Sequence, residues 1–215
     1  MALVASPDHR VAVRELLSLL EPPFLLHFFD TTPEDYEALS DEDLKCEYLD
    51  GELIVHSSAS LGHEELIAFV IAVLREFVAG RRLGRVFGSN AGMQLGERRF
   101  SPDISVLLAQ NYDRIRDERV IGPMDLAVEI ISRSTRAYDF GRKLAAYREG
   151  RVGEIWLIDR ERRQFVVHAW TGEDYVSRVL TTGTWASLAI AGLEIRLDCL
   201  WQEPLPGVRE CLGTT

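Results

Sequence analysis

Two acidic residues lie where an ionised side chain is costly. Asp103 is in "SPDISVLLAQ" and Glu129 in "DLAVEIISRS", and each lies at or inside an apolar run typical of a buried strand. A buried carboxylate needs compensation, so Glu129 has three candidate roles: a structural ion pair, an acid kept neutral by a raised pKa, or a metal ligand. The Pro102–Asp103 pair by itself is more typical of a turn than of a catalytic site.

The two acids together predict more than either does alone. If their strands are neighbours, both carboxylates can hold one Mg²⁺, or Mn²⁺ as the alternative ion, because hard cations prefer oxygen ligands. Such a cation suits phosphodiester hydrolysis, since it would polarise the phosphate and lower the pKa of an attacking water. Lys143 is the candidate for stabilising the developing charge, and Asp139 and Tyr147 lie on the same face of its expected helix. The alternative is an exposed lysine paired with Asp139 along that helix.

His63 is a further candidate catalytic residue. It precedes Ile67 by four residues and Ile71 by eight, so it lies on the core-facing side near the start of an expected helix. From there its imidazole could reach a site at the end of the sheet. The alternative is a packing or capping histidine.

The elements that must position these residues are predicted from periodicity and turn signals. Apolar residues at helical spacing predict a core helix over 63–80, and "RAYDFGRKLAAYREG" predicts another over 136–150. Asp50–Gly51 is a strong hairpin signal between two strand-like segments. Further strands are expected in 85–95, 100–108, 124–132, 154–170, 174–180 and 193–201, and short helices in 11–20 and 31–39.

This order predicts an α/β (α+β) fold on one mixed sheet flanked by helices, with extra strands towards the C-terminus. The strand 124–132 is apolar at nearly every position, so we expect it to be central and covered on both faces. The predicted organisation is an N-terminal helical extension over 1–44, one domain over 45–205 and a tail over 206–215. Apolar runs are too short to cross a bilayer and no signal peptide is evident, so a cytoplasmic protein is expected.

Charge is concentrated in one segment. The formal net charge is −10, which is the wrong sign for a protein that coats nucleic acid without specificity. Residues 30–52 hold ten acids and one base, Lys45, whereas arginines group at 81–85, at 98–99 and along 133–142. These arginines are either a solvated surface or contacts for phosphate.

Several motifs in this order resemble a known family. "CEYLDGELIVHSSASLGHEELI", "SPDISVL", "AVEIIS" and "STRAYDFGRKLAAYREGRVGEIWLID" together resemble the Uma-two family of putative restriction endonucleases, within the PD-(D/E)XK nuclease superfamily. The resemblance covers about residues 45–200 and implies a restriction-endonuclease-like core, with Asp103 and Glu129 as Mg²⁺ ligands and Lys143 as the catalytic lysine. The superfamily pattern places the lysine two residues after the glutamate, where this chain has Ile131.

The resemblance leaves the rest of the site open. Glu47, Glu52 and Glu64 match acidic positions of the family, and one of these or His63 is expected to complete the site. The leading hypothesis is a Mg²⁺-dependent endonuclease acting on DNA as a homodimer. The alternatives are a catalytically silent member that binds nucleic acid or protein, and a metal-dependent hydrolase of a small phosphate ester, which better suits an acidic protein.

Overall fold

A six-stranded mixed sheet forms the centre of the fold in the computed structural model, which describes residues 7–40 and 44–212. Its strand order is β13-β12-β11-β10-β7-β4, and only β10 and β11 run parallel among its neighbouring strands. The expected central strand is confirmed, because β10 has neighbours on both sides and is buried at all five positions. The strands are β4 (Gly84–Gly88), β7 (Ile104–Leu108), β10 (Leu126–Ile130), β11 (Glu154–Asp159), β12 (Gln164–Trp170) and β13 (Tyr175–Leu180).

A second sheet has seven strands in the order β1-β3-β2-β6-β5-β9-β8. The predicted hairpin at Asp50–Gly51 is confirmed, and both residues have the positive φ (52° and 87°) that a tight two-residue hairpin turn requires. These strands are β1 (Leu25–Phe29), β2 (Cys46–Leu49), β3 (Glu52–His56), β5 (Met93–Leu95), β6 (Arg98–Phe100), β8 (Ile115–Arg116) and β9 (Arg119–Ile121). The expectation of a single sheet is therefore wrong in number, although the α/β fold class is confirmed.

The C-terminal strands form a third, small sheet. β14 (Thr184–Ala186) pairs with β15 (Glu194–Arg196), and the chain then turns into a 3₁₀ helix, η3 (Leu197–Trp201). The long strand predicted over 193–201 is thus wrong beyond Arg196, because the partner β14 offers only three residues for pairing.

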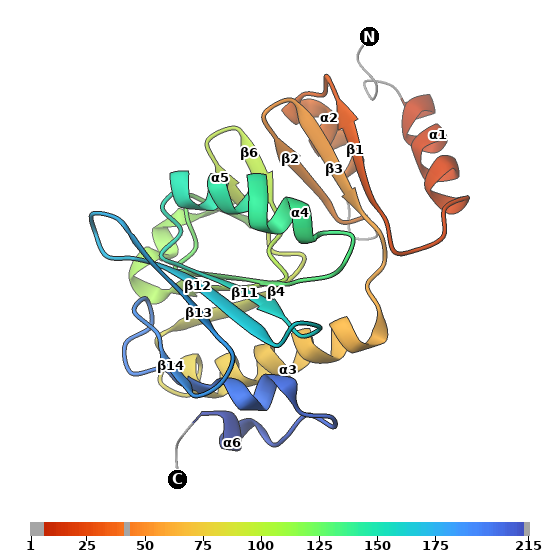
Figure 1. The fold of residues 1–215 in the computed structure, drawn as a ribbon. Helices are drawn as coiled ribbons and strands as arrows, with labels where there is room; N and C mark the ends of the chain where they lie inside the picture. Colours follow the sequence, from red (N-terminus) through yellow and green to blue (C-terminus); the bar gives the residue numbers. More distant parts are fainter. Residues whose placement is uncertain (1–6, 41–43, 213–215) are drawn as a thin grey trace.

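Helices cover both faces of the six-stranded sheet (Figure 1). One face packs against α3 (Leu61–Val78) and the short α6 (Val208–Cys211). The other face packs against α5 (Leu144–Glu149) and the seven-stranded sheet. α3 buries the predicted apolar stripe, and each buried aliphatic or aromatic side chain contributes about 1.5–3 kcal/mol relative to exposure.

The helices of the N-terminal segment lie outside these layers, against the far face of the seven-stranded sheet. The segment contains α1 (Pro7–Ser18) and α2 (Pro33–Leu39), and Thr32 caps α2 as its position before Pro33 predicts. The predicted helical extension over 1–44 also contains the strand β1, which pairs with β3. Residues of the expected tail pack into the core, where Cys211 is fully buried. Within 7–40 and 44–212 no helix is long and apolar enough to cross a membrane.

Candidate active site

The sheet register places Asp103 and Glu129 opposite each other. β7 and β10 are antiparallel neighbours with Ile104 paired to Val128, so the next position outward brings Asp103 beside Glu129. The backbone N–H of Ile130 donates to Asp103 Oδ2 over 2.8 Å. Side chains alternate across a strand, so Glu129 shares the face of Ala127, the face that α5 covers. The sheet thus delivers both acids to one place.

Lys143 joins this pair of acids from the helical segment. Its side chain is 1% exposed, and its Nζ lies 2.8 Å from Glu129 Oε2 and 2.9 Å from Glu47 Oε1. Asp139 is further away, at 3.9 Å, and the Tyr147 hydroxyl donates to Glu129 Oε1 over 2.7 Å. The alternative of an exposed helix pair is wrong, because Lys143 is buried among carboxylates.

The helix carrying Lys143 is not the single regular helix predicted over 136–150. It consists of α4 (Arg136–Tyr138), a π-helical turn η2 (Asp139–Lys143) and α5, and Gly141 has non-helical angles of φ −103° and ψ −110°. A π turn adds a residue to the helical repeat and so rotates the next turns of the helix about its axis. Lys143 and Tyr147 both contact Glu129 of the sheet.

Two basic side chains hold the other acid, Asp103. Lys45 Nζ lies 2.6 Å from Asp103 Oδ1, and His63 Nε2 lies 3.5 Å from Asp103 Oδ2. His63 occupies the first turn of α3, where Ser60 accepts its backbone N–H. Lys45 was not predicted as a site residue. Its signal is nonetheless present in the sequence, because it is the one base among the ten acids of residues 30–52.

Among the three glutamates left open, Glu47 is the one beside Lys143. It is fully buried in β2 and accepts the backbone N–H of Ser101 over 3.0 Å. His56, a residue to which the sequence assigned no chemistry, lies with Nε2 3.3 Å from Glu47 Oε2. Glu52 instead contacts His27 and Arg142, and Glu64 lines the adjoining cleft.

Burial and charge shift the pKa values of these groups in opposite directions. Burial raises the pKa of Glu129 to about 8, with Lys143 opposing the shift and Asp103 adding to it. Burial also acts to raise the pKa of Asp103 and Glu47, but nearby cations outweigh it, so both pKa values are lowered. Those cations are chiefly Lys45 for Asp103 and Lys143 for Glu47. The cations thus favour the ionised forms of Asp103 and Glu47, whereas burial favours the protonated form of Glu129.

The site has a surplus of negative charge when every acid is ionised. Four carboxyl groups, those of Glu47, Asp103, Glu129 and Asp139, face the two ammonium groups of Lys45 and Lys143. The surplus of two charges and the oxygen donors fit a divalent cation. In the part of the chain that the structure describes, however, no three His, Cys, Asp or Glu side chains are already arranged to hold a metal ion. The lysines take up carboxylate oxygens that a cation would need.

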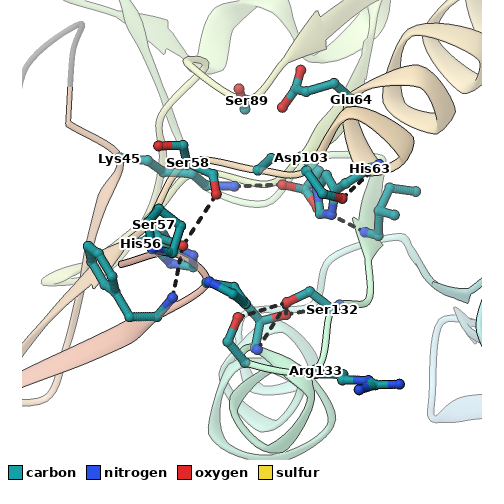
Figure 2. Close-up of a pocket in the computed structure, with 18 of the residues that line it drawn as sticks. Lys45, His56, Ser57, Ser58, His63, Glu64, Ser89, Asp103, Ser132 and Arg133 are labelled. Atoms are coloured by element: carbon teal, nitrogen blue, oxygen red, sulfur yellow. Dashed lines mark hydrogen bonds and ion pairs between the residues drawn. The ribbon is translucent and has the colours of Figure 1, made fainter. Parts of the chain in front are cut away.

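A cleft of about 910 Å³ is lined by Lys45, Asp103, Glu129 and Asp139 of this cluster, and Glu47 and Lys143 lie behind its lining. Figure 2 shows Lys45, Asp103 and His63 between Ser89 and Glu64 on one side and Ser132 and Arg133 on the other. The N-terminal segment forms a further part of the lining, including Phe24. The acids therefore lie inside the protein rather than on its outer surface.

Several of the arginines considered as phosphate contacts are paired with acids. Arg98 pairs with Asp50 and Glu149, and Arg99 pairs with Glu37. The same holds for Arg136 with Asp159 and for Arg142 with Glu52. Their charge is largely used within the protein.

Comparison with known proteins agrees with this fold. The family model Uma2, described as "putative restriction endonuclease", matches residues 33–198. The crystal structure of "a putative nuclease belonging to DUF820 from Anabaena variabilis ATCC 29413" is similar with a TM-score of 0.68, at 19% identity over 79% of this chain and 97% of that chain. At this identity the likeness concerns the fold alone. No curated protein matches the chain.

Proposed function

The chain belongs to the Uma2 family of putative restriction endonucleases, and on this premise we propose that it is a metal-dependent endonuclease that hydrolyses DNA phosphodiester bonds. The observation that carries the proposal is the pairing of Asp103 with Glu129 across β7 and β10, with Lys143 on Glu129. A strongly perturbed pKa in a cleft is typical of functional sites, and Glu129 has one.

In this proposal Asp103 and Glu129 would hold a Mg²⁺ or Mn²⁺ ion, with Glu47 as the nearest additional carboxylate. A bound divalent ion supplies positive charge that polarises a phosphate and lowers the pKa of a water. Both acids are within reach of lysines, so metal binding would replace part of the compensation that Lys45 and Lys143 now give.

The protein's own residues have separate roles. Lys143 places a buried positive charge beside Glu129, where it can stabilise charge that gathers on the phosphoryl oxygens. The His63 imidazole lies 3.5 Å from the Asp103 carboxylate and is the candidate for moving a proton to or from the cleft. Lys45 and the N–H of Ile130 orient the carboxylate of Asp103.

The test joins metal binding to cleavage. Mg²⁺ and Mn²⁺ are titrated calorimetrically into the wild type, Asp103→Asn and Glu129→Gln, and the same proteins are assayed on supercoiled plasmid. We expect binding and nicking to vanish together in both variants. Glu173 is an exposed acid between β12 and β13, so Glu173→Gln is the matched control and should behave as the wild type. Metal-dependent nicking that survives both site variants would contradict the proposal.

A catalytically silent binding protein is the second candidate, favoured by the ion pair of Lys45 with Asp103. A lysine 2.6 Å from the carboxylate competes with a metal ion for the same oxygen. This alternative predicts nucleic-acid binding without metal-dependent cleavage. A hydrolase of small phosphate esters, favoured by the net charge of −10, would instead turn over a model phosphodiester but leave long DNA intact.

Homodimerisation is part of the proposal. β13 is an edge strand of the six-stranded sheet, and its Val179 is 61% exposed. Edge strands can pair with another copy of the chain. A monomeric sedimentation profile at micromolar concentration would contradict a dimer.

A further inference from the structure

The position of the acids restricts which DNA can reach them. Asp103 is 6% exposed and Glu129 is 2% exposed, and both line the interior of the 910 Å³ cleft. That volume is within the range of about 300–1,000 Å³ typical of pockets for small molecules. Duplex DNA is stiff over about 150 base pairs, so a duplex cannot readily bend into a cleft of this size. An unpaired strand can bend into such a cleft.

The cleft has two walls of different chemistry. The N-terminal segment contributes an apolar wall of Leu17, Leu20, Pro22, Pro23 and Phe24. Hydroxyl groups face it from the loop after β10, where the Oγ of Ser132 lies 3.1 Å from Ser134 Oγ and 2.9 Å from Thr135 Oγ1. An apolar surface suits a nucleobase, and hydroxyl groups suit phosphate and sugar.

Hydrogen bonds of the Phe24 backbone join the apolar wall to the side of the cleft that carries the candidate active-site residues. The backbone of Phe24 exchanges two hydrogen bonds with Ser57, its N–H donating to Ser57 Oγ over 3.0 Å and its carbonyl accepting the Ser57 N–H over 3.1 Å. Ser57 comes directly after β3 and lines the cleft beside His56, as Figure 2 shows. These two hydrogen bonds fix the backbone of Phe24 in the cleft lining.

The charged side chains around the cleft favour a contact with only a few phosphates of the substrate. Arg133 lies at the cleft with its side chain 82% exposed, and its pair with Glu161 is exposed on both sides. Exposed pairs contribute little, so Arg133 can exchange Glu161 for a phosphate. Arg98 and Arg99, by contrast, are engaged by acids, and an extended duplex contact needs many such cations.

We propose that the substrate is an unpaired strand of DNA, with a base against the Phe24 wall and its phosphates beside Ser132, Arg133 and Lys45. This inference rests on the proposed nuclease function and narrows it to unpaired DNA. Nicking of a supercoiled plasmid is consistent with it, because negative supercoiling favours local strand opening.

The test is fluorescence anisotropy with one labelled oligonucleotide, presented alone or annealed to its complement, in EDTA so that nothing is cut. We expect the unpaired strand to bind at least tenfold more tightly. Phe24→Ala should weaken that binding by about tenfold, in line with the loss of one base–aromatic stack. Phe29→Ala is the control, because Phe29 is 65% exposed on β1 and does not line the cleft.

Equal or tighter binding of the duplex by the wild type overturns the inference, and this comparison does not depend on any variant folding. Equal losses in Phe24→Ala and Phe29→Ala would also overturn it. Failure of the nuclease proposal is a separate outcome: the unpaired strand would bind preferentially but remain uncut when Mg²⁺ or Mn²⁺ is added.

Discussion

The buried ion pairs of Lys143 allow a direct test of the electrostatics of the site. Lys143→Met keeps most of the side-chain length but removes the charge that compensates Glu47 and Glu129. Removing one partner of a buried pair costs about 3–5 kcal/mol, and at 1% exposure water cannot replace the lost charge. We expect this loss in the free energy of unfolding at pH 8. With a urea dependence of about 3 kcal/mol per molar, the midpoint should fall by about 1–2 M.

The loss should shrink as the pH falls. Lys143 lowers the pKa of both glutamates, so without it both folded pKa values rise relative to the wild type, and that of Glu129 moves further above its usual value of 4.5. An acid with a raised folded pKa binds its proton more tightly in the folded state. The variant is therefore penalised least below about pH 4.5 and loses stability as the pH rises through the raised pKa.

Urea unfolding of the wild type and Lys143→Met at pH 5.5 and pH 8 measures both effects. The double variant Lys143→Met/Glu47→Gln should recover part of the loss at pH 8, because it removes the ionised carboxylate that Lys143 compensates in the wild type. A cost below about 1 kcal/mol at pH 8, or the same cost at both pH values, would refute the reasoning.

Three other features give predictions. Because the pKa of Glu129 is raised to about 8, metal binding at pH 7 should release about one proton, seen as a calorimetric heat that varies with the buffer, and Glu129→Gln should abolish the release. Glu154 is fully buried and accepts hydrogen bonds from two indoles, one hydroxyl and two backbone amides. Glu154→Ala should therefore lower the free energy of unfolding by at least about 3 kcal/mol, and a smaller loss in urea titration would contradict this. A Cβ at Gly84 would lie 2.3 Å from Leu107 O, so Gly84→Ala should cost about 1–3 kcal/mol in thermal unfolding, whereas Gly62→Ala, which meets nothing within 4 Å, should cost much less.

Local patterns predicted most of the elements of the fold. The apolar stripe of α3 and the Asp50–Gly51 hairpin needed only short-range signals, and both formed where expected. The division into two sheets was not predicted, because strand pairing depends on contacts between distant segments. β1 is an example: its five residues carry a histidine among apolar side chains, and it becomes a strand by pairing with β3.

Site residues were predictable where a charged side chain interrupts an apolar run in the sequence. Asp103 and Glu129 stood out because they interrupt apolar runs, and the structure brings them together. Lys45 gave a weaker signal, since nothing local ties it to Asp103, 58 residues further on. Helical periodicity placed Lys143 on one face with Asp139 and Tyr147, but it predicted neither the break at Gly141 nor the burial of Lys143 among carboxylates. Their catalytic roles stay predictions.

The charged cluster is assembled from both large sheets. Glu129 belongs to the six-stranded sheet, Asp103 directly precedes β7 of that sheet, and Glu47 belongs to the seven-stranded sheet. Lys143 contacts Glu129 and Glu47 from the helical segment between the sheets. A chain in which only one sheet has folded therefore has an incomplete cluster, with carboxylates still open to water and free to titrate normally.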